Sequence, residues 1–464
     1  MFACGQLRET GSWMDVFNPY TNERVDSTPR DGPAEVFEAI AATKPTRQLN
    51  PERRKAILCG ASNELRSRAD EFALLITKES GLCIKDSRKE VERAANNLLV
   101  AAEESVRIHG EALQVPAGQA SKLAVTLREP VGLICAITPF NRPLNQVAVK
   151  LGPALAAGNN VILKPSAKTP LTAIALAQLI IRNGLPASML SIVNGDPQEI
   201  GPPLVGSPDV DMIAFTGSIE TGEAVARAAG AKKLLLELGG NDPLIVLDDA
   251  DMRRAASLAA DGAFANAGQS CRGIKRIIVL ERIADELISR LAEETTAKRW
   301  GDPFDPATDV GPLIDAAAAS TVKDRCDQAV RDGAQLVCGG GCEGALVEPT
   351  VLDRVPPNTE LVARETFGPV APVIRAFDDD EAVALANSTV YGLQAGIVTT
   401  SIDRFMRMAN ALRVGGVNLM DGPSFDSPYI PFGGVKRSGV GREGVRYAIH
   451  EMTNLKTITI PQTW

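Results

Sequence analysis

Continuous apolar runs recur through the middle of this chain, and a stretch with helical spacing follows most of them. The runs occupy residues 131–137, 161–163, 190–193, 212–215 and 233–236. A strand that is apolar at every position is covered on both faces, as in a parallel sheet. Strands that alternate with helices predict a parallel, doubly wound α/β sheet, and the carboxyl ends of such strands bind nucleotides. A second α/β series runs from Pro243 to about Val417.

Helical spacing precedes the first of these sheets. Pro51 stands at a predicted helix start, and Gly81 marks a break. A further helix is expected over residues 90–108. Its acidic and basic residues are expected to form a solvated face.

Two strands of mixed polarity lie outside both series, at residues 123–128 and 455–460. Edge strands of this kind are usually covered, often by another subunit. We therefore expect a homodimer or a homotetramer.

The composition excludes several classes of protein. A net charge of −8 offers no basic surface to a nucleic acid. The eight cysteines are scattered through 464 residues, which favours a reducing, cytoplasmic compartment over a disulfide framework. We expect no signal peptide, and no apolar stretch approaches the ~18 residues of a membrane helix. His109 and His450 are the only histidines, and nothing completes a zinc set with Cys338 and Cys342, so we expect no metal site.

Cys271 follows a small-residue helix end that Asn266 and Gly268 break. Asp248 or Asp251 is expected to cap that helix, and residues 276–280 read as a buried strand. A nucleophilic thiol needs this kind of position, with small residues around it and backbone N–H groups nearby. Taken alone, a cysteine in these surroundings is more often an inert core residue. Motifs elsewhere in the chain favour the nucleophile.

Those motifs follow predicted strands. Asn141 offers a neutral amide after the first strand, and Lys164 after the second can reach a ribose or a phosphate. Residues 215–222 form a strand, a Gly-Ser turn and a helix start, which suits a pyrophosphate. Glu237 lies between leucines, so burial is expected to raise its pKa toward that of a general base. An ion-paired or capping glutamate fits Glu237 equally well.

Two further stretches of the sequence bear on cofactor binding: one contains a carboxylate, and the other only resembles a phosphate-binding motif. Glu365 stands close to the aromatic ring of Phe367. Residues 439–444 fit the dinucleotide pattern G-x-G-x-x-G, but no buried strand precedes them. We therefore reject them as a phosphate loop.

Together these motifs resemble the aldehyde dehydrogenase superfamily over essentially the whole chain. The matching stretches, in the family's order, are Thr138-Pro-Phe-Asn141, Lys164-Pro-Ser166, Phe215-Thr-Gly-Ser218, Glu237-Leu-Gly-Gly240, Gly268-Gln-Ser-Cys271, Glu365 with Phe367-Gly-Pro369, and Pro431-Phe-Gly-Gly434. Within the superfamily, Phe140, Asn241 and their neighbours look like the branch of phosphonoacetaldehyde and lactaldehyde dehydrogenases.

The resemblance implies a fold with three parts. A Rossmann-like NAD(P)-binding domain would take residues 1–108 and 129–238, and an α/β catalytic domain residues 239–446. Residues 109–128 and 447–464 would form a small β extension for oligomerisation.

The resemblance also implies a mechanism for oxidising an aldehyde. Cys271 would attack the aldehyde carbon, while the Asn141 amide and the Cys271 N–H hold the oxyanion. Hydride transfer to the nicotinamide would leave a thioester, and Glu237 would activate water to release the acid. Lys150 and Glu443 match positions that relay this proton.

Other residues match cofactor contacts of the family. Lys164 and Glu365 would contact the two riboses, Ser218 the pyrophosphate and Phe367 the nicotinamide. The predicted cofactor-binding residues are Thr138, Pro139, Phe140, Lys164, Ser166, Ala167, Lys168, Phe215, Thr216, Gly217, Ser218, Leu238, Gly239, Glu365 and Phe367. The candidate substrate contacts are Arg142, Ser270, Arg272, Asp426 and Phe432.

Three departures from the family's pattern bear on specificity. Ala167 replaces a glutamate that many NAD-preferring members carry, and Lys168 adds positive charge, so we predict that NADP is accepted. Ser270 replaces the arginine of phosphonoacetaldehyde-type members, and the loop with Asp426 lacks another, which disfavours a phosphonate. Arg142 replaces a histidine, and it either meets a carboxylate or hydroxyl or lies on the surface.

Two rival functions remain at this point. A CoA-acylating aldehyde dehydrogenase would pass the thioester to CoA, but its base position often lacks the glutamate that Glu237 provides. A non-catalytic protein could retain the fold as a scaffold, although the set of Cys271, Glu237 and Asn141 is intact.

Overall fold

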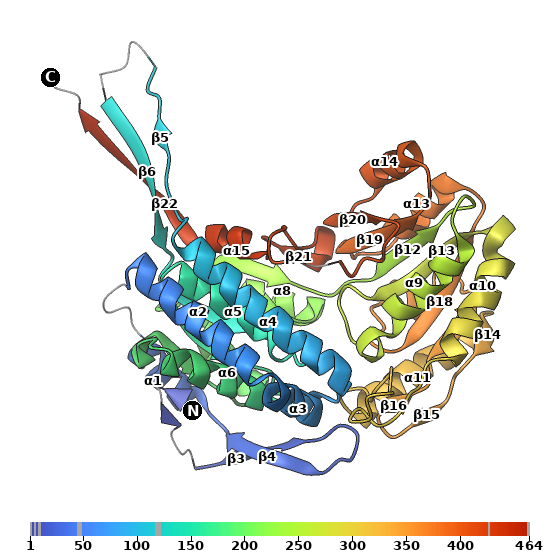
Figure 1. The fold of residues 1–464 in the computed structure, drawn as a ribbon, viewed down its shortest axis with the longest axis horizontal. Coiled ribbons are helices and arrows are strands. Elements are labelled where there is room, and N and C mark those ends of the chain that lie inside the picture. The colour runs from blue at the N-terminus through green and yellow to red at the C-terminus, as the bar shows by residue number, and fades with distance from the viewer. Residues whose placement is uncertain are drawn as a thin grey trace.

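Two α/β bodies and a projecting β extension make up the computed structural model (Figure 1). The structure describes residues 2–3, 6–7, 11–43, 49–116, 122–425 and 427–461. Within these ranges, no helix combines the length and apolarity needed to cross a membrane.

The first body is built on an eight-stranded sheet in the order β2-β1-β9-β8-β7-β10-β11-β21. Its strands are β1 (Phe2–Ala3), β2 (Gln6–Leu7), β7 (Leu133–Ile137), β8 (Asn160–Lys164), β9 (Leu190–Ile192), β10 (Met212–Thr216), β11 (Lys233–Glu237) and β21 (Gly439–Val440). The five predicted runs form the five central strands, and these are all parallel. The edges β1, β2 and β21 pair antiparallel, so the sheet is mixed rather than wholly parallel.

Helices cover both faces of this sheet because both faces are apolar. One core lies under α2 (Pro51–Ser67), α3 (Ala69–Ser80), α4 (Ile84–Ser105), α5 (Asn145–Ala156), α6 (Leu171–Arg182) and α15 (Val445–Glu451). The opposite core lies under α1 (Pro33–Ala42), α7 (Pro197–Gly206) and α8 (Ile219–Ala229). A hairpin of β3 (Trp13–Phe17) and β4 (Arg24–Pro29) lies outside the sheet.

The helix predicted at residues 90–108 is present, but it starts earlier than expected and one of its acidic residues is buried. α4 starts at Ile84, and the Glu90 side chain is fully buried instead of solvated. Glu90 Oε1 accepts hydrogen bonds from the backbone N of Leu144 (2.9 Å) and of Asn145 (3.1 Å). The first amides of a helix need acceptors, and a buried carboxylate that meets this need is stabilised by their partial positive charge.

The second body has a seven-stranded sheet in the order β14-β17-β18-β13-β12-β19-β20. Its strands are β12 (Asp242–Val246), β13 (Ile274–Leu280), β14 (Gln335–Cys338), β17 (Thr350–Asp353), β18 (Val370–Ala376), β19 (Gln394–Val398) and β20 (Gly416–Leu419). Its helices are α9 (Met252–Phe264), α10 (Glu281–Thr296), α11 (Ala316–Arg331), α12 (Glu360–Ala363), α13 (Asp379–Asn387) and α14 (Ile402–Ala411), and a short β15–β16 pair (Cys342–Glu343 and Leu346–Val347) lies beside the sheet. All its strand pairs are parallel except β14 with β17.

The two strands predicted outside the sheets are present and pair with each other. β6 (Lys122–Pro130) runs antiparallel to β22 (Thr453–Pro461), and β5 (Ala112–Leu113) joins them. This three-stranded extension projects from the first body in Figure 1. Its exposed apolar side chains include Leu127, Leu455 and Ile460. Between the second body and β22, the chain returns to the first sheet through β21, which pairs with β11.

Candidate active site

The loop that carries Cys271 leaves α9 through a short stretch of left-handed backbone. Asp251, one of the two candidate caps, starts α9 by accepting from Arg253 N and Arg254 N. At the other end φ is +54° at Asn266, +52° at Ala267 and +71° at Gly268. Ala267 in this region costs about 1–2 kcal/mol, which the packing around it must offset.

Gly268 cannot be replaced without moving the backbone. A Cβ at this position would lie 1.9 Å from the carbonyl oxygen of Gly368. The Cys271 loop is therefore packed directly against the segment that follows Glu365. This contact places the predicted nucleophile beside a predicted cofactor contact.

Asn141 and the Cys271 loop are tied together by amide hydrogen bonds. Asn141 Nδ2 donates to the Gln269 carbonyl at 2.8 Å, and Asn266 Nδ2 donates to the Asn141 carbonyl at 2.9 Å. Gln269 is anchored in turn, because its Oε1 accepts from Ile314 N at 2.9 Å. The predicted meeting of residues 141 and 271 is thus found in the fold. A side-chain amide has two N–H donors, so Asn141 keeps one for a ligand.

Cys271 lies between two cavities. We call them the Phe367 cavity, of about 400 Å³, and the Arg142 cavity, of about 260 Å³, after one residue in the wall of each. Cys271, Asn141 and Gln146 belong to both walls. A thiol in this position can meet one molecule from each side.

The Phe367 cavity is lined by nine of the predicted cofactor residues. These are Pro139, Phe140, Thr216, Gly217, Ser218, Leu238, Gly239, Glu365 and Phe367. The rings of Phe140 and Phe367 meet edge to face, with centroids 6.0 Å apart. Burial raises the pKa of Glu365 to about 7, and Gly240 N donates to its carboxylate at 3.4 Å.

These residues fit a nicotinamide dinucleotide. The Ser218 side chain caps α8, whose N-terminus opens on the cavity and suits a pyrophosphate. A Cβ at Gly239 would come 2.4 Å from Glu365 Oε2, so a larger residue there would push that carboxylate away. The aromatic wall suits a flat ring, and the carboxylate suits ribose hydroxyls.

Six predicted cofactor residues lie outside this wall. They are Thr138, Lys164, Ser166, Ala167, Lys168 and Phe215. Lys164 is buried, and its Nζ donates to the Pro165 carbonyl at 3.2 Å. Lys168 Nζ lies 3.2 Å from Asp315 Oδ2, so its charge is shared with an acidic partner.

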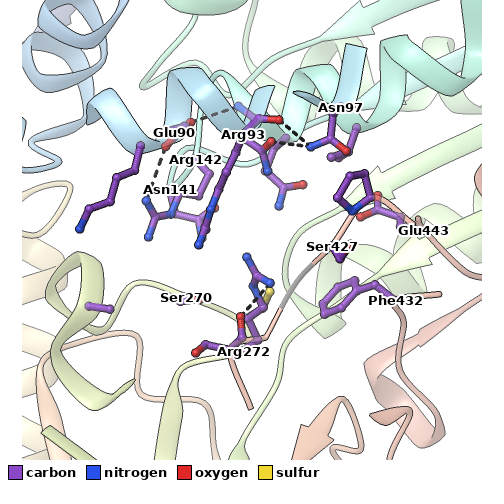
Figure 2. Close-up of a pocket in the computed structure, with 18 of the residues that line it drawn as sticks. Glu90, Arg93, Asn97, Asn141, Arg142, Ser270, Arg272, Ser427, Phe432 and Glu443 are labelled. Carbon is purple, nitrogen blue, oxygen red and sulfur yellow. Dashed lines mark hydrogen bonds and ion pairs between the residues drawn. The ribbon is translucent and has the colours of Figure 1, made fainter. Parts of the chain in front are cut away.

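The Arg142 cavity contains four of the five candidate substrate residues: Arg142, Ser270, Arg272 and Phe432. Asp426 lies outside the described residues. Arg142 is not a surface residue, because its Nη1 lies 3.7 Å from Glu90 Oε2 and its side chain is 20% exposed. On the other side of the cavity, the Arg272 guanidinium lies 5.7 Å from the centroid of the Phe432 ring (Figure 2).

Helix α4 supplies a wall of this cavity that the sequence did not predict. Glu90, Arg93 and Asn97 point into it together, as Figure 2 shows. Their spacing of three and four residues places them on one helix face, which the sequence could have shown. Nothing in the sequence indicates that this face looks onto Cys271. Gln146, Arg325, Arg364 and Tyr391 also line the two cavities without having been predicted.

Glu237 lies at the end of β11, beside the Phe367 cavity but not in its wall. It is 2% exposed, and neither carboxylate oxygen has a partner among the described residues. Burial raises its pKa well above the usual value, and the charge of Glu443 adds to this effect. The Lys150 ammonium opposes that rise and forms a 2.9 Å ion pair with Glu443 Oε1. Glu443 in turn lines the Arg142 cavity.

The Cys271 thiol is itself hard to ionise. Burial raises its pKa to about 12, and Arg272 is the largest influence in the opposite direction. Glu365, Asp242 and Glu237 add to the rise. Among the described residues, no group of three or more His, Cys, Asp and Glu side chains could hold a metal ion.

Comparison with known proteins gives a consistent result. The model of the aldehyde dehydrogenase family matches residues 7–458. A 3-sulfolactaldehyde dehydrogenase of Priestia aryabhattai is 40% identical, over 99% of this chain and 97% of that protein. A lactaldehyde dehydrogenase of Methanococcus maripaludis is 37% identical, over 97% and 98% of the two chains. The crystal structure of the glyceraldehyde-3-phosphate dehydrogenase GapN of Methanocaldococcus jannaschii with NADP superposes with a TM-score of 0.94, at 38% identity, over 98% of this chain and 100% of that one.

Proposed function

The chain belongs to the aldehyde dehydrogenase family and is an NAD(P)-dependent enzyme that oxidises aldehydes to acids; within that activity, we propose that Cys271 is the nucleophile and that water releases the acid. The observation that carries this proposal is the position of Cys271 in the walls of two cavities, one lined by nine of the predicted cofactor residues and one by four of the candidate substrate residues.

The first half of the reaction follows from this placement. An aldehyde in the Arg142 cavity presents its carbonyl carbon to the Cys271 sulfur. The oxygen that becomes negative is met by the Asn141 amide and the Cys271 N–H. A nicotinamide held by the residues of the Phe367 cavity would supply the acceptor for the hydride that leaves the aldehyde carbon. A thioester on Cys271 remains.

The second half requires a base, and Glu237 is the candidate. Burial raises the pKa of its carboxyl, and a carboxylate with a raised pKa is a stronger base toward water. Its carboxylate now faces Gly433, since a Cβ there would lie 2.7 Å from Oε1. Rotation of the Glu237 side chain toward Cys271 would bring the carboxylate to the place where it can activate water. Lys150 and Glu443 then offer the proton a path to the Arg142 cavity.

The substrate is inferred to be a small hydroxylated aldehyde that bears an anionic group. Two of the relatives above act on such compounds, 3-sulfolactaldehyde and glyceraldehyde 3-phosphate, and the third acts on lactaldehyde. Arg93, Arg142 and Arg272 line the cavity and suit a sulfonate or a carboxylate. Ser270 adds no further cation, which makes a phosphonate dianion a poorer candidate.

The remaining assignments concern the enzyme as a whole. We propose that NADP is accepted, because Ala167 offers no carboxylate against a 2′-phosphate and Lys168 lies next to it. The exposed apolar side chains of β6 and β22 support a homodimer or a homotetramer. The scattered free cysteines support a cytoplasmic location.

An aldehyde panel tests the proposal. Lactaldehyde, 3-sulfolactaldehyde and an amino-bearing aldehyde are each assayed with NAD and with NADP, and the product is identified with and without CoA. Free acid in the absence of CoA is expected. A strict need for CoA would favour the acylating alternative. For the scaffold alternative, uniform slow labelling of all cysteines would be the supporting result.

A further inference from the structure

Lys275 is a buried cation for which the mechanism above has no role. It lies on β13, four residues after Cys271, and is 4% exposed. Burial lowers the pKa of its ammonium, while Glu365, Cys271 and Asp242 oppose that change. Lysine is seldom buried unless it is paired, because desolvating the charge is costly. Its place beside the reactive thiol therefore requires a physical reason.

The ammonium is held inside the Cys271 loop. Lys275 Nζ donates to the carbonyl of Gly268, which also accepts from Ser270 N at 2.9 Å. A Cβ at Gly273 would lie 3.4 Å from the same nitrogen. One cation thus bonds to one end of the turn that contains Cys271 and lies close to its other end. Backbone with positive φ, such as that at Gly268, persists only when surrounding contacts fix it.

The same ammonium reaches the wall of the Phe367 cavity. Its nitrogen lies 5.2 Å from the centroid of the Phe367 ring, within the range of a cation–π interaction. Phe367 is followed by Gly368, whose carbonyl packs against Gly268. Lys275 therefore bridges the turn that positions the sulfur and the wall that the nicotinamide would face.

The charge balance around the thiol gives the cation a second effect. Arg272 beside Cys271 favours the thiolate, while Asp242 on β12, Glu237 on β11 and Glu365 in the loop before β18 oppose it. Two buried cations, Lys275 and Arg276, lie on the strand that follows Cys271, and of these Lys275 bonds inside the Cys271 loop, where the thiolate in turn raises the pKa of its ammonium. A buried charge acts over longer distances than an exposed one, because little water screens it.

We propose that Lys275 is a positioning residue for the reaction: its ammonium fixes the Gly268 turn, and with it the Cys271 sulfur, against the Phe367 wall, and its charge favours the Cys271 thiolate. This inference rests on the proposed role of Cys271 as the nucleophile. It adds a residue that touches neither substrate nor transferred hydride but sets where the sulfur lies and how readily it ionises.

Alkylation of Cys271 by iodoacetamide, followed by peptide mass spectrometry across a range of pH, tests the proposal on the whole enzyme. Lys275→Met is expected to shift the alkylation profile to higher pH by about one pH unit, a tenfold slower reaction at neutral pH. Lys275→Arg keeps the charge but changes the geometry, so its profile should stay close to that of the unmodified enzyme while kcat falls several-fold. This second variant keeps a buried cation and tests the proposal even if the methionine variant does not fold.

Arg276 provides a matched control on the same strand. It is also buried, and its guanidinium binds the carbonyls of Asn241, Leu385 and Ala386 instead of the Cys271 loop. Arg276→Met should lower Tm without moving the alkylation profile. An unchanged profile in Lys275→Met, or a fully active Lys275→Arg enzyme, would overturn the inference. If alkylation of Cys271 leaves aldehyde oxidation by the unmodified enzyme intact, the proposed function itself fails.

Discussion

The two cavities that meet at Cys271 are built in different ways. The Phe367 cavity is walled mainly by strand ends and by the turns that follow them, at β7, β10 and β11. The Arg142 cavity is walled by one face of α4, by the start of α5 and by the loops around Arg272 and Phe432. The wall of the Phe367 cavity is therefore made of backbone positions that the sheet fixes. The wall of the Arg142 cavity uses side chains that can change without altering the sheet.

This difference separates what the fold requires from what specificity requires. A cofactor shared by a whole family suits a wall made of strand ends, glycines and a helix N-terminus. Substrates differ between members, and side chains on a helix face can be exchanged at low cost in stability. We therefore expect changes in the two cavities to affect different kinetic constants.

The largest effect should come from Cys271, one of the three residues that the two cavities share. Cys271→Ala removes the proposed nucleophile, so aldehyde oxidation should fall by roughly 10⁴-fold or more. Cofactor binding, measured by fluorescence titration, should change little. Cys326→Ala is the control, since that cysteine is buried on α11 and lines neither cavity. Comparable activity in the two variants would show that Cys271 is not the nucleophile.

A smaller effect is expected from one exposed arginine in each wall. Arg93→Met in the Arg142 cavity should raise KM for an anionic aldehyde about tenfold, because a hydrogen bond to a charged group is lost. KM for the cofactor should stay unchanged. Arg364→Met in the Phe367 cavity should raise KM for the cofactor and leave KM for the aldehyde unchanged. Steady-state kinetics with the aldehyde and the cofactor varied in turn give both KM values. Equal effects of both variants on both KM values would refute the assignment of one cavity to each ligand.

The smallest effect concerns the choice between cofactors. Ala167→Glu adds a carboxylate where a 2′-phosphate is expected, so kcat/KM with NADP should fall several-fold more than with NAD. The effect on NADP use should be small, because Lys168, the nearby cation that would attract the 2′-phosphate, already shares its charge with Asp315. Ala167→Gln, of similar size but neutral, is the control. A parallel loss with both cofactors would mean that residue 167 lies away from the ribose.

The sequence predicted the Phe367 cavity far better than the Arg142 cavity. Ser218, Gly239 and Glu365 each follow a motif whose backbone geometry is local, so short stretches of sequence were enough. Glu90 and Arg93 lie far from Cys271 in the sequence, and only the packing of α4 on α5 brings them to the site. Glu90 was expected in solvent because most glutamates are. Its burial depends on the helix start that it caps, which no local pattern reveals.

The central claim is that Cys271 holds the substrate as a thioester between the two cavities while Glu237 prepares the water. Glu237→Gln should slow release of the acid, since a neutral amide cannot take the proton. The direct measurement is peptide mass spectrometry of this variant, quenched after mixing with an aldehyde and NADP. We predict that the acyl group of the substrate is found on the Cys271 peptide, with one reduced cofactor formed per enzyme. An acyl group on another residue, or continuous turnover at the unmodified rate, would contradict the account.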